Sequence, residues 1–139
     1  LYGDVGRGKS MIIDLFYHNI SFTKKLRIHF HEFMSLIHLK LKNHRNNRKK
    51  KEDLVKSIIK DLSKSYDIIC LDELQITDIV DAMIIGKIFR EIFMNNIAII
   101  VTSNRSPEEL YKNGLQREKF LPFVDLIQEK MEILHLDNQ

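Results

Sequence analysis

Short apolar runs alternate with longer amphipathic stretches along this chain, a pattern that predicts an α/β fold with a parallel sheet and crossover helices. We predict a strand at each apolar run: Lys25–Phe30, Asp67–Leu71, Ile97–Thr102 and Met131–Leu136. Two of these runs, Ile68–Leu71 and Ile97–Val101, contain only apolar residues. We therefore expect two central strands covered by helices on both faces of the sheet.

Between the strands, apolar residues recur at helical spacing. One such stripe, with lysines on the opposite face, consists of Leu54, Val55, Ile58, Ile59 and Leu62. Asp78–Met94 is apolar over most of its circumference and predicts a long buried helix. Ser106 followed by Pro107 and Glu109 predicts the start of a short helix, and Asn113-Gly114 predicts its end.

Composition narrows the class of protein. The 139 residues are 44% hydrophobic, enough for one core and too few for two ordinary domains, and five Gly and two Pro exclude a low-complexity chain. A single cysteine, Cys70, excludes a disulfide-stapled secreted fold. No apolar run reaches the roughly 18 residues that cross a bilayer. We therefore expect one globular domain, spanning 1–139, in a reducing compartment.

The formal net charge is only +3, and the excess is concentrated in residues 40–51. This basic segment lacks apolar periodicity, so we interpret it as an exposed insertion between two helical pieces. A basic run can bind nucleic acid or anionic lipid, but no aromatic residue is interleaved here to stack on bases. We favour a solvated loop.

The first ten residues carry the most specific motif. Gly3-Asp4-Val5-Gly6-Arg7-Gly8-Lys9-Ser10 matches G-x-x-x-x-G-K-[ST] without a gap, and a helical pattern follows it. Glycines let successive backbone N–H groups turn inward around phosphate oxygens, and the helix N-terminus adds positive potential. Lys9 would reach the β- and γ-phosphates of a nucleotide, and Ser10 would ligate Mg²⁺.

A pair of carboxylates supports this interpretation. Asp72 and Glu73 directly follow the apolar run Ile68–Leu71. An acidic residue at the end of such a strand holds Mg²⁺ directly or through water. Glu73 is then the candidate general base that deprotonates an attacking water, which favours hydrolysis over nucleotide storage.

The third predicted strand ends in Thr102-Ser103-Asn104-Arg105. Ligands of doubly wound folds lie beyond the carboxyl ends of the strands, so Asn104 could contact the γ-phosphate or the attacking water. The alternative is that Asn104 merely begins a turn. The segment lacks the Lys and Asp of a guanine-selecting Asn-Lys-x-Asp element. Arg117 is our candidate for an arginine that reaches the nucleotide of a neighbouring subunit, with Arg105 as the rival.

Other polar residues receive structural interpretations. His29 and His31 would share one face of a strand, and we expect them to pack or form hydrogen bonds rather than bind a metal. We assign Cys70 to the core. Asp78 and Asp81 suit the start of a helix, so we interpret them as capping residues.

Five segments together resemble the AFG-like, or ZapE-type, AAA+ ATPases: Leu1–Ser10, His29–Met34, Leu71–Met83, Thr102–Arg105 and Leu110–Phe123. The His-Phe-His-Glu-Phe and Asn-Gly-Leu-Gln-Arg blocks are the most diagnostic. The resemblance runs from Leu1 to about Asp137 and leaves the basic segment unmatched. It implies a P-loop NTPase core with strand order 5-1-4-3-2, of which the first strand and the C-terminal lid are largely missing here.

The resemblance also implies roles for individual residues. Gly3–Ser10 would bind ATP, Ser10 and Asp72 would hold Mg²⁺, and Glu73 would act as base. Asn104 would act as the sensor of the γ-phosphate, and Arg117 as the finger. The family further implies a homo-oligomeric motor acting on protein clients, with peripheral membrane association.

Relatives act in mitochondria or at the bacterial division site. We expect a mitochondrial protein, with the periphery of the bacterial cytoplasmic membrane as the alternative. A nucleic-acid-acting ATPase such as a helicase loader is the main alternative function, and a small-molecule kinase is a third, disfavoured by the Asp72-Glu73 pair.

Overall fold

The computed structural model describes residues 1–4, 8–21, 24–43 and 50–136. The helices are α1 (Lys9–Asn19), α2 (Phe30–Asn43), α3 (Lys51–Ser65), α4 (Ile79–Met94) and α5 (Arg117–Lys130), with a single 3₁₀ turn η1 (Pro107–Glu109). The strands are β1 (Lys25–His29), β2 (Ile68–Asp72) and β3 (Ala98–Val101). None of the helices within these ranges is long and apolar enough to cross a membrane.

The three strands form a parallel sheet in the order β1-β2-β3. Beyond β3, Tyr2 forms parallel bridges with Ser103 on one side and with His135 on the other. When these bridges are counted with the strands, the sheet has the predicted order 5-1-4-3-2. In this order the first strand is reduced to Tyr2 and the fifth to His135. The rings of Tyr2 and His135 stack at 4.5 Å.

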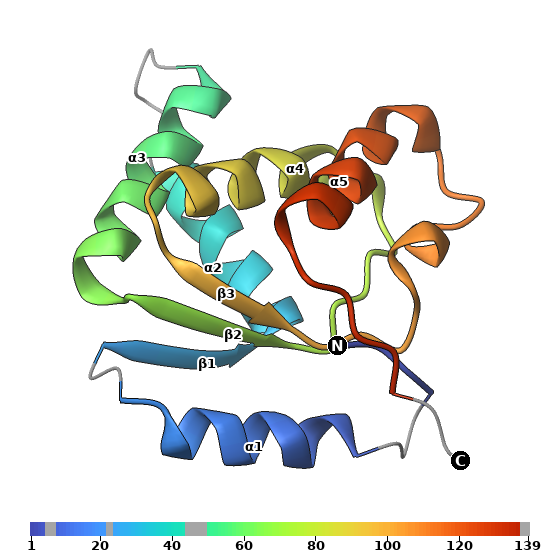
Figure 1. Cartoon of the computed structure of the whole chain (residues 1–139). Coiled ribbons are helices and arrows are strands. Elements are labelled where there is room, and N and C mark those ends of the chain that lie inside the picture. Colours follow the sequence, from blue (N-terminus) through green and yellow to red (C-terminus); the bar gives the residue numbers. More distant parts are fainter. Residues whose placement is uncertain (5–7, 22–23, 44–49, 137–139) are drawn as a thin grey trace.

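Helices cover the two faces of the sheet unequally. Four helices, α2 to α5, lie on one face, and α1 lies on the other (Figure 1). The core forms under the four-helix layer, and its largest fully buried side chains include Phe30, Phe33, Phe89, Phe120, Ile59 and Ile85. Cys70 is also buried, as predicted, and burial raises the pKa of its thiol.

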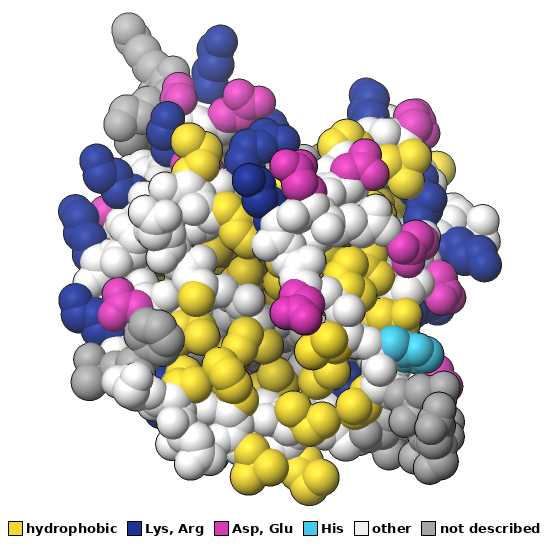
Figure 2. Space-filling model, viewed as in Figure 1, with side chains coloured by type: hydrophobic (Ala, Val, Ile, Leu, Met, Phe, Trp, Pro, Cys, Tyr) yellow, Lys and Arg dark blue, Asp and Glu magenta, His cyan; other side chains and the backbone are white. Residues whose placement is uncertain are grey.

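The prediction of two strands buried on both faces is confirmed for β2 and wrong for β3. Residues 68–71 are all buried, whereas Ala98 is exposed and Ile99 and Ile100 are half-buried. The reason is that α1 contacts β2 and no described helix covers β3 on that face. Figure 2 shows hydrophobic side chains gathered in the lower part of this view, where β3 and α1 lie.

The predicted strand Met131–Leu136 is wrong as a strand, because only His135 bridges to Tyr2. The predicted helix from Ser106 is limited to the three residues of η1. The predicted end at Asn113-Gly114 is therefore wrong, because η1 ends at Glu109; Asn113 lies in the loop after it, in the left-handed region with φ of 62°. The two ends of the predicted insertion 40–51 are helical, because residues 40–43 belong to α2 and Lys51 begins α3; residues 44–49 lie outside the described residues.

Candidate active site

The first part of the site is the turn that precedes α1. Gly8 is the N-cap of α1 and has φ of 86°, a conformation that favours glycine. Gly3 is buried, and a Cβ at this position would lie 2.5 Å from the carbonyl oxygen of Leu136. The backbone therefore requires glycine at both positions. Of the remaining motif residues, Val5, Gly6 and Arg7 lie outside the described residues.

Lys9 lies at the first position of α1 and points back into this turn. Lys9 is only 8% exposed, and its Nζ donates to the carbonyl oxygens of Gly3 and Asp4 at 2.7 Å each. Carbonyl oxygens carry no net charge, so these hydrogen bonds satisfy the ammonium group without neutralising it. A buried cation held in this way favours an anionic ligand beside it. Ser10, the next residue of α1, is exposed.

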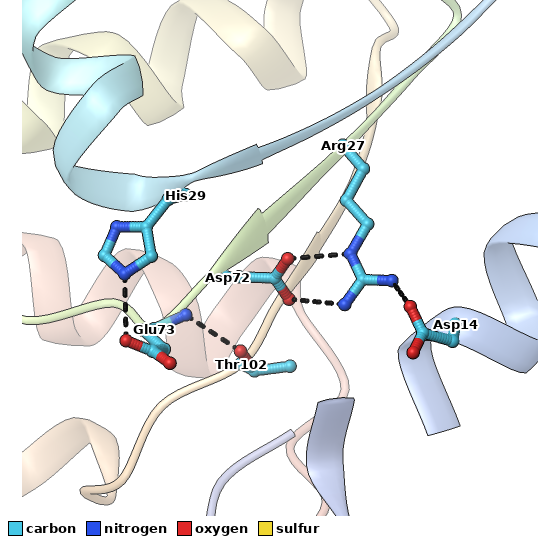
Figure 3. Close-up of polar contacts among 6 residues, drawn as sticks. All are labelled: Asp14, Arg27, His29, Asp72, Glu73 and Thr102. Carbon is cyan, nitrogen blue, oxygen red and sulfur yellow. Dashed lines mark hydrogen bonds and ion pairs between the residues drawn. The ribbon is translucent and has the colours of Figure 1, made fainter. Parts of the chain in front are cut away.

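The second part of the site is Asp72, the last residue of β2. Arg27 of β1 donates from Nε to Oδ2 of Asp72 at 2.7 Å and from Nη2 to Oδ1 at 3.4 Å. The same guanidinium donates from Nη1 to Asp14 of α1. Figure 3 shows the guanidinium lying between the two carboxylates. Arg27 therefore connects the helix that follows the glycine-rich turn to the strand that carries the acidic pair.

Glu73 is held by both its backbone and its carboxylate. Its φ is 59°, in the left-handed region, and its N–H donates to Oγ1 of Thr102 at 2.9 Å. Its Oε2 lies 2.8 Å from Nε2 of His29 (Figure 3). Because the N–H of His31 donates to Nδ1 of His29 at 3.2 Å, a neutral His29 carries its proton on Nε2 and donates it to Glu73.

These contacts confirm that His29 is a hydrogen-bonding residue. They correct the expectation that His29 and His31 share a strand face, because β1 ends at His29 and His31 lies in the first turn of α2. The chain changes from strand to helix at this point, which turns the N–H of His31 toward the imidazole of His29.

Glu73 shares a cavity of about 540 Å³ with Asn104 and Arg105. The same cavity is lined by Lys112 and Tyr111, from the loop that follows η1. The structure thus brings Asn104 and Arg105 to the same hollow as Glu73, beyond the carboxyl ends of β2 and β3, whereas Asp72 does not line it. Both residues are exposed.

Arg117 does not line this cavity. Its Nη2 donates to the carbonyl oxygens of Glu108 at 2.5 Å and Leu110 at 3.2 Å, and its Nε is buried without a hydrogen-bond partner. In this conformation Arg117 fixes the loop after η1. Of the two arginines considered for a catalytic role, Arg105 is the one that lines the cavity with Glu73.

The capping prediction is confirmed for Asp78. Asp78 is the N-cap of α4, and its Oδ1 accepts from the N–H of Asp81 at 2.8 Å. The carboxylate of Asp81 has a different partner, Nε2 of His38 in α2, at 2.6 Å. These contacts anchor the start of α4 just after the acidic pair.

Sequence reasoning missed three residues of this site: Arg27, Asp14 and Thr102. The alternation of β1 offered one signal, since Arg27 and His29 are two residues apart and therefore share a face. Their partners at the end of β2, Asp72 and Glu73, lie 45 and 44 positions away along the chain. Only the pairing of β1 with β2 brings them together.

Comparison with known proteins identifies relatives over the whole chain. The profile of the AFG1-like ATPases matches residues 1–139. An uncharacterized protein of Schizosaccharomyces pombe is 39% identical over 99% of this chain, and the cell division protein ZapE of Escherichia coli K12 is also 39% identical over 99%. Lactation elevated protein 1 homolog B of Danio rerio is 38% identical over 99%. The chain spans 29% to 36% of the length of these relatives.

Solved structures share the fold at low sequence identity. Domain III of the Thermotoga maritima replication initiation protein DnaA superposes with a TM-score of 0.66 at 19% identity, covering 98% of this chain and 52% of that one. DnaI superposes with a TM-score of 0.63 at 19% identity, covering 99% and 69%. These likenesses establish the α/β P-loop fold, and the profile match over all 139 residues places the chain in the AFG1-like ATPase family.

Proposed function

We propose that this chain is the core of an ATPase domain that binds ATP at Gly3–Ser10 and hydrolyses it with Glu73 as general base. Support comes from the family, whose members are described as ATPases, and from the position of the acidic pair beside α1. In this proposal the glycine-rich turn encloses the phosphates, and Lys9 binds the terminal ones.

The observation that carries the proposal is the environment of Lys9. Its ammonium group is buried and bonded to two neutral carbonyl oxygens, so its positive charge is available to an anion. Phosphate oxygens could replace these carbonyl oxygens at charge-assisted hydrogen-bonding distance. An ordinary structural lysine would be exposed or paired with a carboxylate.

The residues present also fit Mg²⁺. No group of three or more His, Cys, Asp or Glu in the described part of the chain could hold a metal by itself. Mg²⁺ keeps several waters and is commonly bound by one or two protein oxygens together with substrate phosphates. The Ser10 hydroxyl and the Asp72 carboxylate would hold the ion, which would neutralise phosphate charge when bound.

Glu73 has the contacts that a general base needs. Thr102 fixes its backbone and His29 orients one carboxylate oxygen, so its other oxygen is available to accept a proton from water. Asn104, in the same cavity, would donate from its amide to the water or to the phosphate that departs.

We further propose that the protein works as a homo-oligomer on protein clients, associated peripherally with a membrane. Arg117 would complete the site of a neighbouring subunit after leaving its backbone partners, and Arg105 is the alternative because it lines the same cavity as Glu73. Hydrolysis per subunit that rises and then saturates with protein concentration supports a site completed in trans. A flat and substantial rate contradicts it.

A nucleic-acid-acting ATPase is the second candidate function, favoured by the basic residues at positions 40–51. Reversing the charge of Lys50 and Lys51, both exposed, should abolish salt-sensitive DNA or RNA binding if this function is correct. Unchanged binding would contradict the nucleic-acid function. For localisation we propose mitochondria, with the bacterial cytoplasm at the membrane periphery as the alternative, to be distinguished by imaging of the tagged protein.

The proposal is tested first by Lys9→Ala. Loss of a charged hydrogen bond to phosphate should weaken binding of a fluorescent ATP analogue at least about tenfold. Lys60→Ala, which removes an exposed lysine from α3, is the matched control and should leave binding unchanged. If folded Lys9→Ala protein binds the analogue as tightly as the wild type, the phosphate role of Lys9 is wrong.

A further inference from the structure

Arg27 is the one residue that touches both α1 and the acidic pair among the contacts shown in Figure 3. Its Nε and Nη2 face the two oxygens of Asp72, while its Nη1 binds Asp14. The side chains of Arg27 and Asp72 are 20% and 19% exposed, so water screens this pair only in part. The side chain of Asp14 is 56% exposed.

This geometry places a permanent positive charge where the proposed function requires a metal ligand. A guanidinium does not lose its proton at any physiological pH, and its planar fork matches the two oxygens of a carboxylate. A divalent cation that approaches Asp72 therefore meets a cation already in place. The two positive charges repel each other across a few ångströms.

On the basis of the proposed function, we propose that Arg27 is the resident counter-ion of Asp72, which keeps divalent cations from binding there until nucleotide is present. The phosphates of the nucleotide would supply negative charge that offsets the charge of Arg27, so that the ion could bind. Asp14 would then retain the guanidinium as Asp72 turns toward the metal. Arg27 is thus a positioning residue that acts through Asp72.

The consequence of removing Arg27 follows from Coulomb's law. A unit charge about 6 Å from a divalent ion changes its affinity about tenfold even at the dielectric constant of water, and more in a partly buried site. Without Arg27, the carboxylates of Asp14 and Asp72 would face each other without a cation between them. Both changes favour binding of a divalent cation in the absence of nucleotide.

The test is Mn²⁺ binding to the nucleotide-free protein, measured by the loss of the electron paramagnetic resonance signal of free Mn²⁺. We expect Arg27→Gln to bind Mn²⁺ at least about tenfold more tightly than the wild type at low ionic strength. The double variant Arg27→Gln/Asp72→Asn should lose this gain, which would place the ion at Asp72. Arg27→Lys, which keeps the charge but not the fork, should fall between the wild type and Arg27→Gln.

Lys87→Gln is the matched control, because Lys87 of α4 also pairs with a carboxylate, Glu52 of α3, at 2.9 Å. It should leave Mn²⁺ binding unchanged. Circular dichroism establishes that each variant is folded. If Arg27→Gln is unfolded, Mn²⁺ binding is compared between Arg27→Lys and the wild type instead. The counter-ion role is overturned if folded Arg27→Gln binds Mn²⁺ no more tightly than the wild type. If Arg27→Gln does not fold, the same result for Arg27→Lys overturns it.

A second measurement separates this inference from the proposed function. Mg²⁺ should strengthen binding of a fluorescent ATP analogue to the wild type and not to Asp72→Asn. If Asp72→Asn retains the full effect of Mg²⁺, the proposed metal ligand is wrong, and the counter-ion role is overturned with it. If Asp72→Asn loses the effect while Arg27→Gln leaves nucleotide-free Mn²⁺ binding unchanged, only the role of Arg27 is overturned.

Discussion

Individual residues in strained backbone conformations surround the candidate site. Among the described residues, five other than glycine have positive φ: Glu73, Asn96, Tyr111, Asn113 and Gln116. Such conformations cost about 1 kcal/mol or more and persist only where surrounding contacts enforce them. The left-handed conformation of Glu73 is enforced by the contacts of Glu73 with Thr102 and His29. Three of the others lie in the loop that lines the cavity or in the residues just after it, so strain is concentrated near the proposed chemistry.

Gly114 is required in this loop for a steric reason rather than for its φ. A Cβ at this position would come closer than 3.0 Å to the ring of Tyr111. The ring cannot move away easily, because Tyr111 is buried and its hydroxyl donates to the carbonyl oxygen of Leu115 at 2.8 Å. Gly114→Ala should therefore lower the free energy of unfolding by about 1–3 kcal/mol.

Chemical denaturation of Gly114→Ala measures this effect, with exposed Asn104→Ala as a control that leaves the Tyr111 ring untouched. A variant as stable as the wild type would mean that the loop repacks without cost, and the close contact would then carry no energetic meaning.

At the scale of elements, the sequence predicts those whose pattern is local. The three strands appear within one residue of their predicted bounds, α3 buries four of the five residues of its predicted stripe, and α4 is the long helix predicted over Asp78–Met94. Helix α5 was missed, although Phe120, Phe123, Val124 and Ile127 follow helical spacing, because Pro122 interrupts the pattern. The last strand was overpredicted because an apolar run does not reveal whether a partner strand lies beside it.

Helix α4 offers a test of these packing arguments. Gly86 lies in its interior, and a Cβ at this position would meet only the Cβ of Phe123, at an ordinary contact distance of 3.7 Å. Glycine destabilises a helix interior relative to alanine by roughly 0.5–1 kcal/mol. Gly86→Ala should therefore raise the melting temperature, measured by circular dichroism. A lower melting temperature would show that the added methyl group does not fit between α4 and α5.

At the scale of the whole molecule, the sheet brings together segments that are far apart in the sequence. The glycine-rich turn, the acidic pair and Asn104 were predictable because each follows from a motif or from the rule that ligands lie at the carboxyl ends of parallel strands. The partners Arg27, Asp14 and Thr102 were not, because they depend on the register of β2 with its neighbours β1 and β3 and on where α1 crosses the sheet. A single sequence carries no direct signal of either.

The proposed hydrolysis of ATP through Glu73 is tested most directly by Glu73→Gln. The amide keeps the size of the side chain but cannot accept a proton, so ATP should bind within about threefold of the wild type while turnover falls about 10²–10⁴-fold. Glu129→Gln, at an exposed position on α5, is the matched control and should hydrolyse ATP normally. Binding and single-turnover hydrolysis measured on the same protein would separate the two steps. Retained binding with lost turnover is the predicted result, and hydrolysis by Glu73→Gln at the wild-type rate would contradict the assignment.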